Sequence, residues 1–165
     1  MRSSVKILAA LLIIVGLSGC GLGQAETNTA SMEGVGNGVD LTSAEVWIQD
    51  VTIVNDGDSV GISATAINKS DAEIALSSIE IDATALSLVE SGVPATAGIP
   101  IAPDAALRIG FESSTSAVAA ATMKTGDYVT VTFTFTDGSI VTGEALIVSK
   151  TGHYSTVTTD LPVAA

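Results

Sequence analysis

Alternating apolar and polar side chains dominate residues 128–136 of this chain. Valine and phenylalanine take one face of the expected strand and threonine takes the other, as in a strand with one buried side. Asp137 and Gly138 follow, and both residue types tolerate the positive φ angles of a tight hairpin turn. Residues 140–148 then return as a partner strand. The pattern therefore predicts a β-hairpin over residues 128–148.

Shorter β-type segments fill much of the chain upstream of this hairpin. They are rich in β-branched residues or alternate between apolar and small polar residues. Turn-forming residues separate them at 55–58 and 68–71, and the glycine- and proline-rich stretch 91–103 predicts a loop or irregular edge. The segments expected to be strands are 46–48, 51–54, 59–68, 75–76, 79–81 and 107–111.

Only residues 118–123 have the composition of a helix, and that run is short. Several short strands separated by turns predict an all-β chain folded as an antiparallel β-sandwich. Aromatic residues are scarce at 4% of the sequence, so the few present are expected to anchor the core. These aromatic residues are Trp47, Phe111, Phe133 and Phe135. From Gly152 onward the chain is expected to fray.

The first twenty residues have the features of a processing signal. Arg2 and Lys6 provide a basic start, and residues 7–15 form an uninterrupted apolar run. Such a run behind positive charge is typical of a secretory signal peptide. It is shorter than the roughly 20 apolar residues that a membrane span requires.

Leu17-Ser18-Gly19-Cys20 resembles the lipobox of bacterial lipoproteins. The Cys20 thiol would receive the diacylglycerol, small Ser18 and Gly19 would admit the signal peptidase, and Leu17 would fill an apolar pocket. Cleavage before Cys20 and full acylation would give a stable membrane anchor, since two or more acyl chains hold a protein firmly. The sequence therefore predicts lipidation at Cys20 and a position on the extracytoplasmic face of the cell membrane.

Four regions are expected along the chain. Residues 1–19 form the signal peptide, and residues 20–40, rich in glycine and small polar residues, form a flexible lipid-anchored tether. Residues 41–150 form the β-sandwich domain, and residues 151–165 form a C-terminal tail. Gly34, Gly36 and Gly38 do not predict a nucleotide-binding loop, because they neither follow a strand nor open a helix.

Composition and charge exclude several classes of function. The 165 residues contain 6 Lys+Arg against 18 Asp+Glu, a formal net charge of −12, which argues against nucleic-acid binding through phosphate contacts. Cleavage before Cys20 would remove two basic residues and leave a side-chain charge of −14. One cysteine excludes an internal disulfide framework and any multi-cysteine metal site.

Three groups of residues have the chemistry of a site, and each also has a plain structural interpretation. His153 can be interpreted as a metal ligand, as a general base or as an exposed tail residue. Asp56 and Asp58 can be interpreted as Ca²⁺ ligands or as part of a turn. The turn is preferred, because an EF-hand loop that began at Asp56 would require a glutamate at the position of Ile67. Glu80 and Asp82 lie on one face of a strand as paired carboxylates or as a solvated surface. The sequence therefore predicts no catalytic, cofactor-binding or metal-binding residues.

Several short motifs resemble the LpqE-type lipoproteins of actinobacteria. These motifs are the lipobox with Gly23-Gln24, Gln49-Asp50-Val51, Ala66-Ile67-Asn68-Lys69-Ser70, and Thr125-Gly126-Asp127-Tyr128 with the threonine-rich strand behind it. The domain is also similar to the periplasmic copper chaperones of the PCuAC type. That resemblance implies an immunoglobulin-like, cupredoxin-like sandwich.

Those chaperones bind Cu(I) through Met and His residues, which suit that soft ion. Here the mature chain has only Met32, Met123 and His153, and residues 113–117 contain no His or Met where the chaperones place such a pair. The resemblance is therefore carried over for the fold and not for the metal site.

Two functions of different classes remain. The first is a surface-tethered, non-catalytic binding or scaffold domain of the cell envelope, with an unidentified envelope protein or ligand as its partner and no cofactor. The alternative is an extracytoplasmic copper chaperone-like carrier that has lost or altered the usual Met and His ligands. An envelope enzyme is disfavoured because His, Cys and Lys are scarce.

Overall fold

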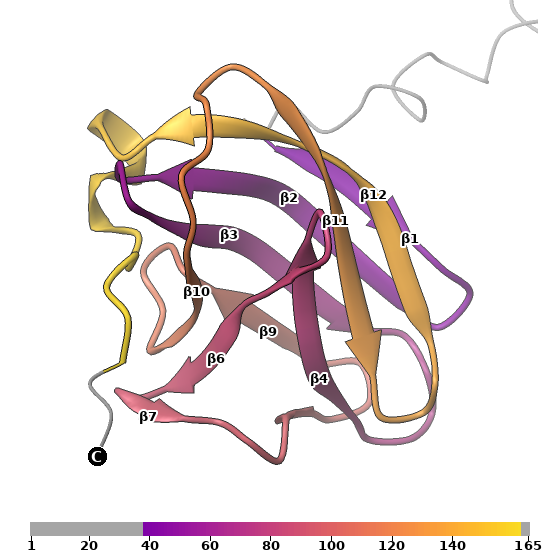
Figure 1. Ribbon diagram of the computed structural model, residues 1–165. Coiled ribbons are helices and arrows are strands. Elements are labelled where there is room, and N and C mark those ends of the chain that lie inside the picture. The colour runs from indigo at the N-terminus through magenta and orange to yellow at the C-terminus, as the bar shows by residue number, and fades with distance from the viewer. Residues whose placement is uncertain (1–37, 163–165) are drawn as a thin grey trace, which may run out of the picture. The chain divides into compact units, whose positions relative to one another are not determined.

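The computed structural model describes residues 38–162, which fold into twelve strands and one short 3₁₀ helix (Figure 1). The strands are β1 (Val39–Thr42), β2 (Val46–Asn55), β3 (Ser59–Asn68), β4 (Ile74–Ile81), β5 (Thr84–Ala85), β6 (Ser87–Glu90), β7 (Val93–Pro94), β8 (Ile99–Ile101), β9 (Ala106–Ile109), β10 (Thr115–Ala120), β11 (Tyr128–Phe135) and β12 (Ile140–Ser149). The helix, η1, covers Gly152–Thr156. Within these residues no helix is long and apolar enough to cross a membrane.

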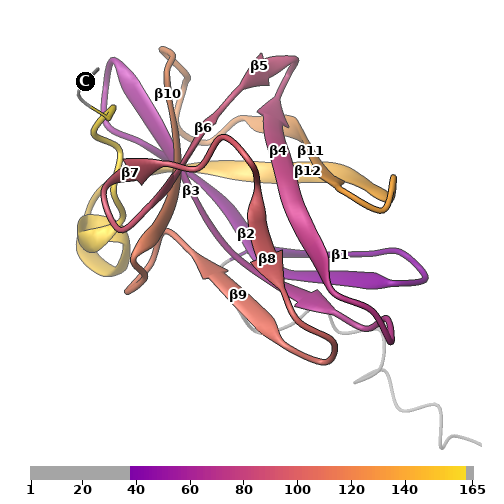
Figure 2. The ribbon, with the colours of Figure 1, turned by 90° about the horizontal axis from the view of Figure 1, so that it is seen from below.

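Strand β12 joins the two sides of the fold. Its first part pairs with β11 in antiparallel register, and its last three residues, Ile147 to Ser149, pair with β2 in parallel. Beyond β11 lie β4 and β5, and beyond β2 lie β3, β10, β6 and β7. Figure 2 shows how the sheet curls, with β4 and β11 on one side and β1, β2 and β9 on the other. The architecture confirms the all-β, mostly antiparallel sandwich expected from the sequence.

The core lies inside this curl and consists mainly of aliphatic residues from all the long strands. Phe133 and Phe135 are 0% and 2% exposed, as the alternating pattern of β11 predicts. The hairpin of β11 and β12 is also confirmed, with Thr132 opposite Thr142 in its register. Strand β3 covers the same residues as the alternating segment 59–68.

Several expected elements differ from the structure. Residues 118–123 are not helical, because Val118 lies between β3 and β6 as part of the buried strand β10. Pairing on both sides satisfies the backbone of this alanine-rich run, so tertiary contacts override its helical preference. The segments 75–76 and 79–81 are one strand, β4, rather than a pair, and the segments 46–48 and 51–54 are likewise one strand, β2. The expected loop 91–103 contains the short strands β7 and β8.

Part of the expected core is wrong. Trp47 is 36% exposed and Phe111 is only partly buried, so neither side chain anchors the core. The expectation that the chain frays from Gly152 is also wrong, since Val157 and Thr159 are both 0% exposed. Cys20, the predicted lipidation site, lies outside the described residues.

Candidate functional site

The loop between β9 and β10, residues 110–114, contains the start of the stretch 113–117, in which the sequence analysis found neither His nor Met; the rest of that stretch belongs to strand β10. Gly110 starts the loop with a φ of +80°, and a Cβ there would collide with the carbonyl oxygen of Ile62. Glu112 also has a positive φ, 47°. Because the backbone turns sharply at these two residues, the loop folds back on itself before β10 begins.

Hydroxyl groups in this loop bind backbone atoms. Ser113 Oγ donates to the carbonyl oxygen of Arg108 at 2.6 Å and accepts from the amide of Thr115 at 3.0 Å. The amide of Ser91, beyond β6, donates to the carbonyl oxygen of Ser114 at 2.8 Å. The Ser113 hydroxyl is thus engaged in holding the loop in shape.

The only histidine in the sequence lies against this loop. The His153 ring stacks on Phe111 with 4.3 Å between ring centroids and 28° between ring planes. The Tyr154 ring packs edge-on against the His153 ring, with 5.1 Å between ring centroids. His153 is exposed, as expected from the sequence, but it belongs to the ordered helix η1. The fold therefore brings an imidazole next to residues 110–114.

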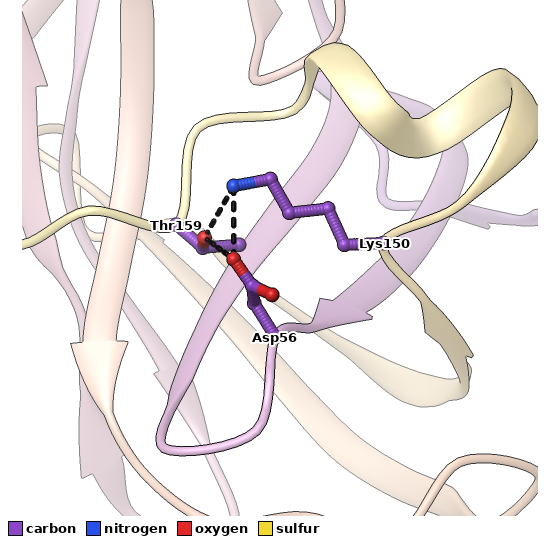
Figure 3. Close-up of polar contacts among 3 residues, drawn as sticks. All are labelled: Asp56, Lys150 and Thr159. Atoms are coloured by element: carbon purple, nitrogen blue, oxygen red, sulfur yellow. Dashed lines mark hydrogen bonds and ion pairs between the residues drawn. The ribbon is translucent and has the colours of Figure 1, made fainter.

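A second polar cluster fastens the segment that carries His153, residues 150–160 (Figure 3). Lys150 Nζ donates to Asp56 Oδ2 at 3.0 Å and to Thr159 Oγ1 at 2.9 Å. The Thr159 hydroxyl in turn donates to Asp56 Oδ2 at 3.0 Å. Asp56 comes from the turn between β2 and β3, so one carboxylate ties together both ends of the C-terminal segment.

Hydrogen bonding to the charged form lowers the pKa of Asp56 below its ordinary value. The bond from Lys150 is the largest cause, and the bond from Thr159 is the second. Both donors stabilise the carboxylate and not the carboxylic acid. Asp56 therefore stays ionised at any pH at which the protein is expected to work.

Beside this cluster, Asn55 has a buried oxygen without a partner. Its Nδ2 donates to the carbonyl oxygen of Met123 at 2.8 Å, whereas Oδ1 is the one buried side-chain polar atom of residues 38–162 that has no hydrogen bond. This pairing fixes the loop before β11, which contains Met123, against the end of β2. Met123 itself packs partly buried against the core.

The acidic pairs singled out from the sequence lie in two different surroundings. Asp56 is engaged by Lys150, in agreement with a plain turn. Asp82 is not on a strand face with Glu80, because β4 ends at Ile81 and Asp82 adopts a φ of 46° in the turn, where its Oδ1 accepts from the amide of Thr130. Nowhere in the described chain do three or more His, Cys, Asp or Glu residues gather in a group that could hold a metal ion.

Sequence reasoning missed both long-range contacts of the C-terminal segment. Asp56 and Lys150 are 94 residues apart, and each stands in an ordinary local context directly after a strand. Phe111 and His153 are similarly remote from each other. No spacing rule links such residues, so only the three-dimensional fold shows them together.

Comparison with solved structures agrees with this architecture. The chain is similar to the copper-bound PCuAC domain from PmoF2, with a TM-score of 0.57, 11% identity, and coverage of 67% of this chain and 97% of that domain. For the apo PmoF2 PCuAC domain the TM-score is 0.55 and the identity 13%, with coverage of 70% of this chain and 98% of that domain. For the apo PCuAC domain from PmoF1 the TM-score is 0.55 and the identity 12%, with coverage of 67% of this chain and 98% of that domain. The fold is therefore PCuAC-like.

Sequence comparisons add no family. No known protein-family profile matches the chain, and no curated protein sequence matches it. The resemblance to the LpqE-type lipoproteins gains no support from these comparisons and rests on the short motifs alone. At 11–13% identity the structural likeness defines the fold and leaves the ligands open.

Proposed function

We propose that this protein is an extracytoplasmic copper chaperone-like carrier in which the usual Met and His ligand set has been altered. The observation that supports it most is the likeness to a copper-bound PCuAC domain over 97% of that domain's length. The lipobox at Cys20 supports attachment to the outer face of the cell membrane. A carrier held there would handle copper outside the cytoplasm.

The altered ligand set has a chemical consequence. Within residues 38–162, His153 is the single imidazole and Met123 the single thioether, while acidic side chains are abundant. Nitrogen and oxygen donors suit Cu(II), whereas several thioethers are needed to favour Cu(I). We therefore expect this protein to prefer Cu(II) over Cu(I), with His153 as the nitrogen ligand.

A chelator-competition titration tests this proposal. The chain from residue 20 onward, with Cys20→Ser to remove the thiol, is titrated with Cu(II) and separately with Cu(I). We expect one Cu(II) per chain, weakened at least about tenfold, or roughly 1.4 kcal/mol, by His153→Ala and unchanged by Met123→Leu. Zn²⁺ and Ca²⁺ serve as controls for nonspecific binding to the acidic surface.

The second candidate is a non-catalytic binding or scaffold domain of the envelope. It is favoured by the 110–114 loop, in which the Ser113 hydroxyl binds backbone atoms and no Met or His side chain is present. If the titration finds no copper bound more tightly than Zn²⁺ or Ca²⁺, this candidate replaces the carrier. Cross-linking in intact envelopes would then be expected to give one defined partner protein.

A further inference from the structure

One sheet face combines the only tryptophan of the chain with exposed basic side chains. Thr42, Trp47, Ile67 and Ala106 stand directly opposite one another across β1, β2, β3 and β9. Residues directly opposite in antiparallel strands lie on the same side of a sheet. The next row across β2, β3 and β9 contains Gln49, Thr65 and Arg108. We call these seven residues the Trp47 face.

The apolar row of the Trp47 face is accessible. Trp47 is 36% exposed, Ala106 is exposed, and Ile67 is half-buried. The alternation of β2 places Val46 and Ile48 in the core, at 0% exposure, so Trp47 necessarily points outward. An indole with an apolar body and one N–H donor is suited to the boundary between lipid and water.

The distribution of basic side chains also favours a lipid surface as the partner of the Trp47 face. Among the described basic residues, Lys150 is paired with Asp56 and Lys124 lies 3.5 Å from Asp127. The other two, Arg108 and Lys69, form no ion pair within residues 38–162. Arg108 belongs to the Trp47 face.

Lys69 extends this face by one position beyond β3. Its amide donates to the carbonyl oxygen of Glu45 at 2.8 Å, which continues the β2–β3 ladder in register with Ile67 two residues earlier. The rows that contain Arg108 and Lys69 therefore lie on either side of the Trp47 row, with the exposed Glu45 directly opposite Lys69 on the same face. The guanidinium and ammonium groups are the donors there that can bind a lipid phosphate. Elsewhere the acidic surface would be repelled by anionic headgroups.

The chain connectivity points to the same face. The tether expected over residues 20–40 runs directly into β1, whose Thr42 is in the same row as Trp47. A lipid on Cys20 would keep β1 and its neighbouring strands within reach of the bilayer surface. We propose that the Trp47 face rests on the membrane, with Trp47 at the depth of the headgroups and Arg108 and Lys69 on lipid phosphates.

This inference rests on the proposed lipid anchor, and the experiment separates the two. Flotation of the natively expressed full chain with phosphatidylglycerol–phosphatidylcholine vesicles tests the anchor. The face is tested on the chain from residue 20 coupled through its single thiol, Cys20, to a maleimide lipid in the same vesicles. Coupling imposes the tether, so the second result does not depend on natural acylation.

Trp47 is the sole tryptophan and reports on its own surroundings. With brominated phosphatidylcholine, we expect quenching and a blue shift of its emission, and less of both after Arg108→Glu. The matched control moves the reporter to β11 by Trp47→Phe with Tyr128→Trp, a 66% exposed position on the other side of the fold, and should show no quenching.

Unquenched Trp47 emission in the coupled chain would overturn the proposal. So would a Trp47 that is shielded from acrylamide and yet unaffected by brominated lipid, since a second copy or another protein would then cover the face. Failure of the native chain to float would instead refute the anchor alone.

Discussion

Asn68 connects three parts of the fold through one buried amide, and its removal has a calculable cost. The side chain is 0% exposed at the end of β3. Its Nδ2 donates to the carbonyl oxygens of Ala72 at 2.7 Å, Ile101 at 3.0 Å and Ala102 at 3.2 Å. Its Oδ1 accepts from the amide of Ser70 at 2.9 Å and from the hydroxyl of Ser70 at 2.7 Å.

Asn68→Ala should therefore lower the free energy of unfolding by roughly 3 kcal/mol. A typical internal hydrogen bond contributes about 0.5–1.5 kcal/mol, and a buried group left unpaired adds to the loss. The matched control is Asn55→Ala, which removes an amide with a single hydrogen bond, to Met123, and should cost about 1 kcal/mol. Urea denaturation followed by circular dichroism measures both values.

Asn68→Asp gives the same site a pH dependence. At neutral pH the introduced carboxylate faces carbonyl oxygens and has no proton to donate, so this variant should be less stable than Asn68→Ala. The neutral acid regains one donor, which raises the pKa of the introduced carboxyl in the folded state above its unfolded value. The folded state then binds more protons, so the variant loses stability as the pH rises from about 4 toward 7.

Two outcomes would refute this reasoning. One is an Asn68→Ala cost below about 0.5 kcal/mol, the size of an ordinary surface substitution. The other is an Asn68→Asp variant whose stability rises, relative to wild type, between pH 4 and pH 7. Either result would mean that the buried amide does not hold the β3–β4 turn to β8.

Three further predictions concern the C-terminal segment. Truncation after Lys150 should lower the free energy of unfolding by about 2 kcal/mol or more in urea denaturation, because it removes the buried side chain of Val157 and exposes the surface that this side chain covers. Unchanged stability would mean that the segment after Lys150 is frayed after all. Gly61→Ala should cost about 1–3 kcal/mol by thermal melting, because a Cβ there would collide with the carbonyl oxygen of Thr158; a neutral result would show that the segment does not pack on β3. Lys150→Met should lower the melting temperature at pH 7 and have a smaller effect near pH 3. The Lys150 hydrogen bond lowers the pKa of Asp56 in the folded state, so it contributes stability above the unfolded-state pKa of about 3.9, and this stability is lost as the pH falls through the folded-state pKa. A destabilisation that grows toward low pH would contradict the assignment.

Local patterns predicted the strands whose partners are near in sequence. The hairpin at residues 128–148 carries its own turn and a strict alternation, so a few residues determine both register and buried face. Strand β10 was missed because its alanines favour a helix in isolation, and only its position between β3 and β6 makes it a strand. The fold class followed from the number of short strands and needed no long-range contacts.

The candidate site was harder to predict. Trp47 was expected in the core because aromatic residues are scarce, but the alternation of β2 gives the core positions to Val46 and Ile48. The stack of His153 on Phe111 depends on a chain segment that the sequence suggested was loose. Such contacts arise from the folding of distant segments onto one another, and their residues carry no local signal.

Electron paramagnetic resonance of the Cys20→Ser chain loaded with one equivalent of Cu(II) tests the proposed carrier function most directly. We predict a single bound Cu(II) whose spectrum shows coupling to one imidazole nitrogen, and the loss of that coupling in His153→Ala. A spectrum of free aqueous Cu(II), or one that His153→Ala leaves unchanged, would contradict the proposal that this PCuAC-like domain carries copper through an altered ligand set.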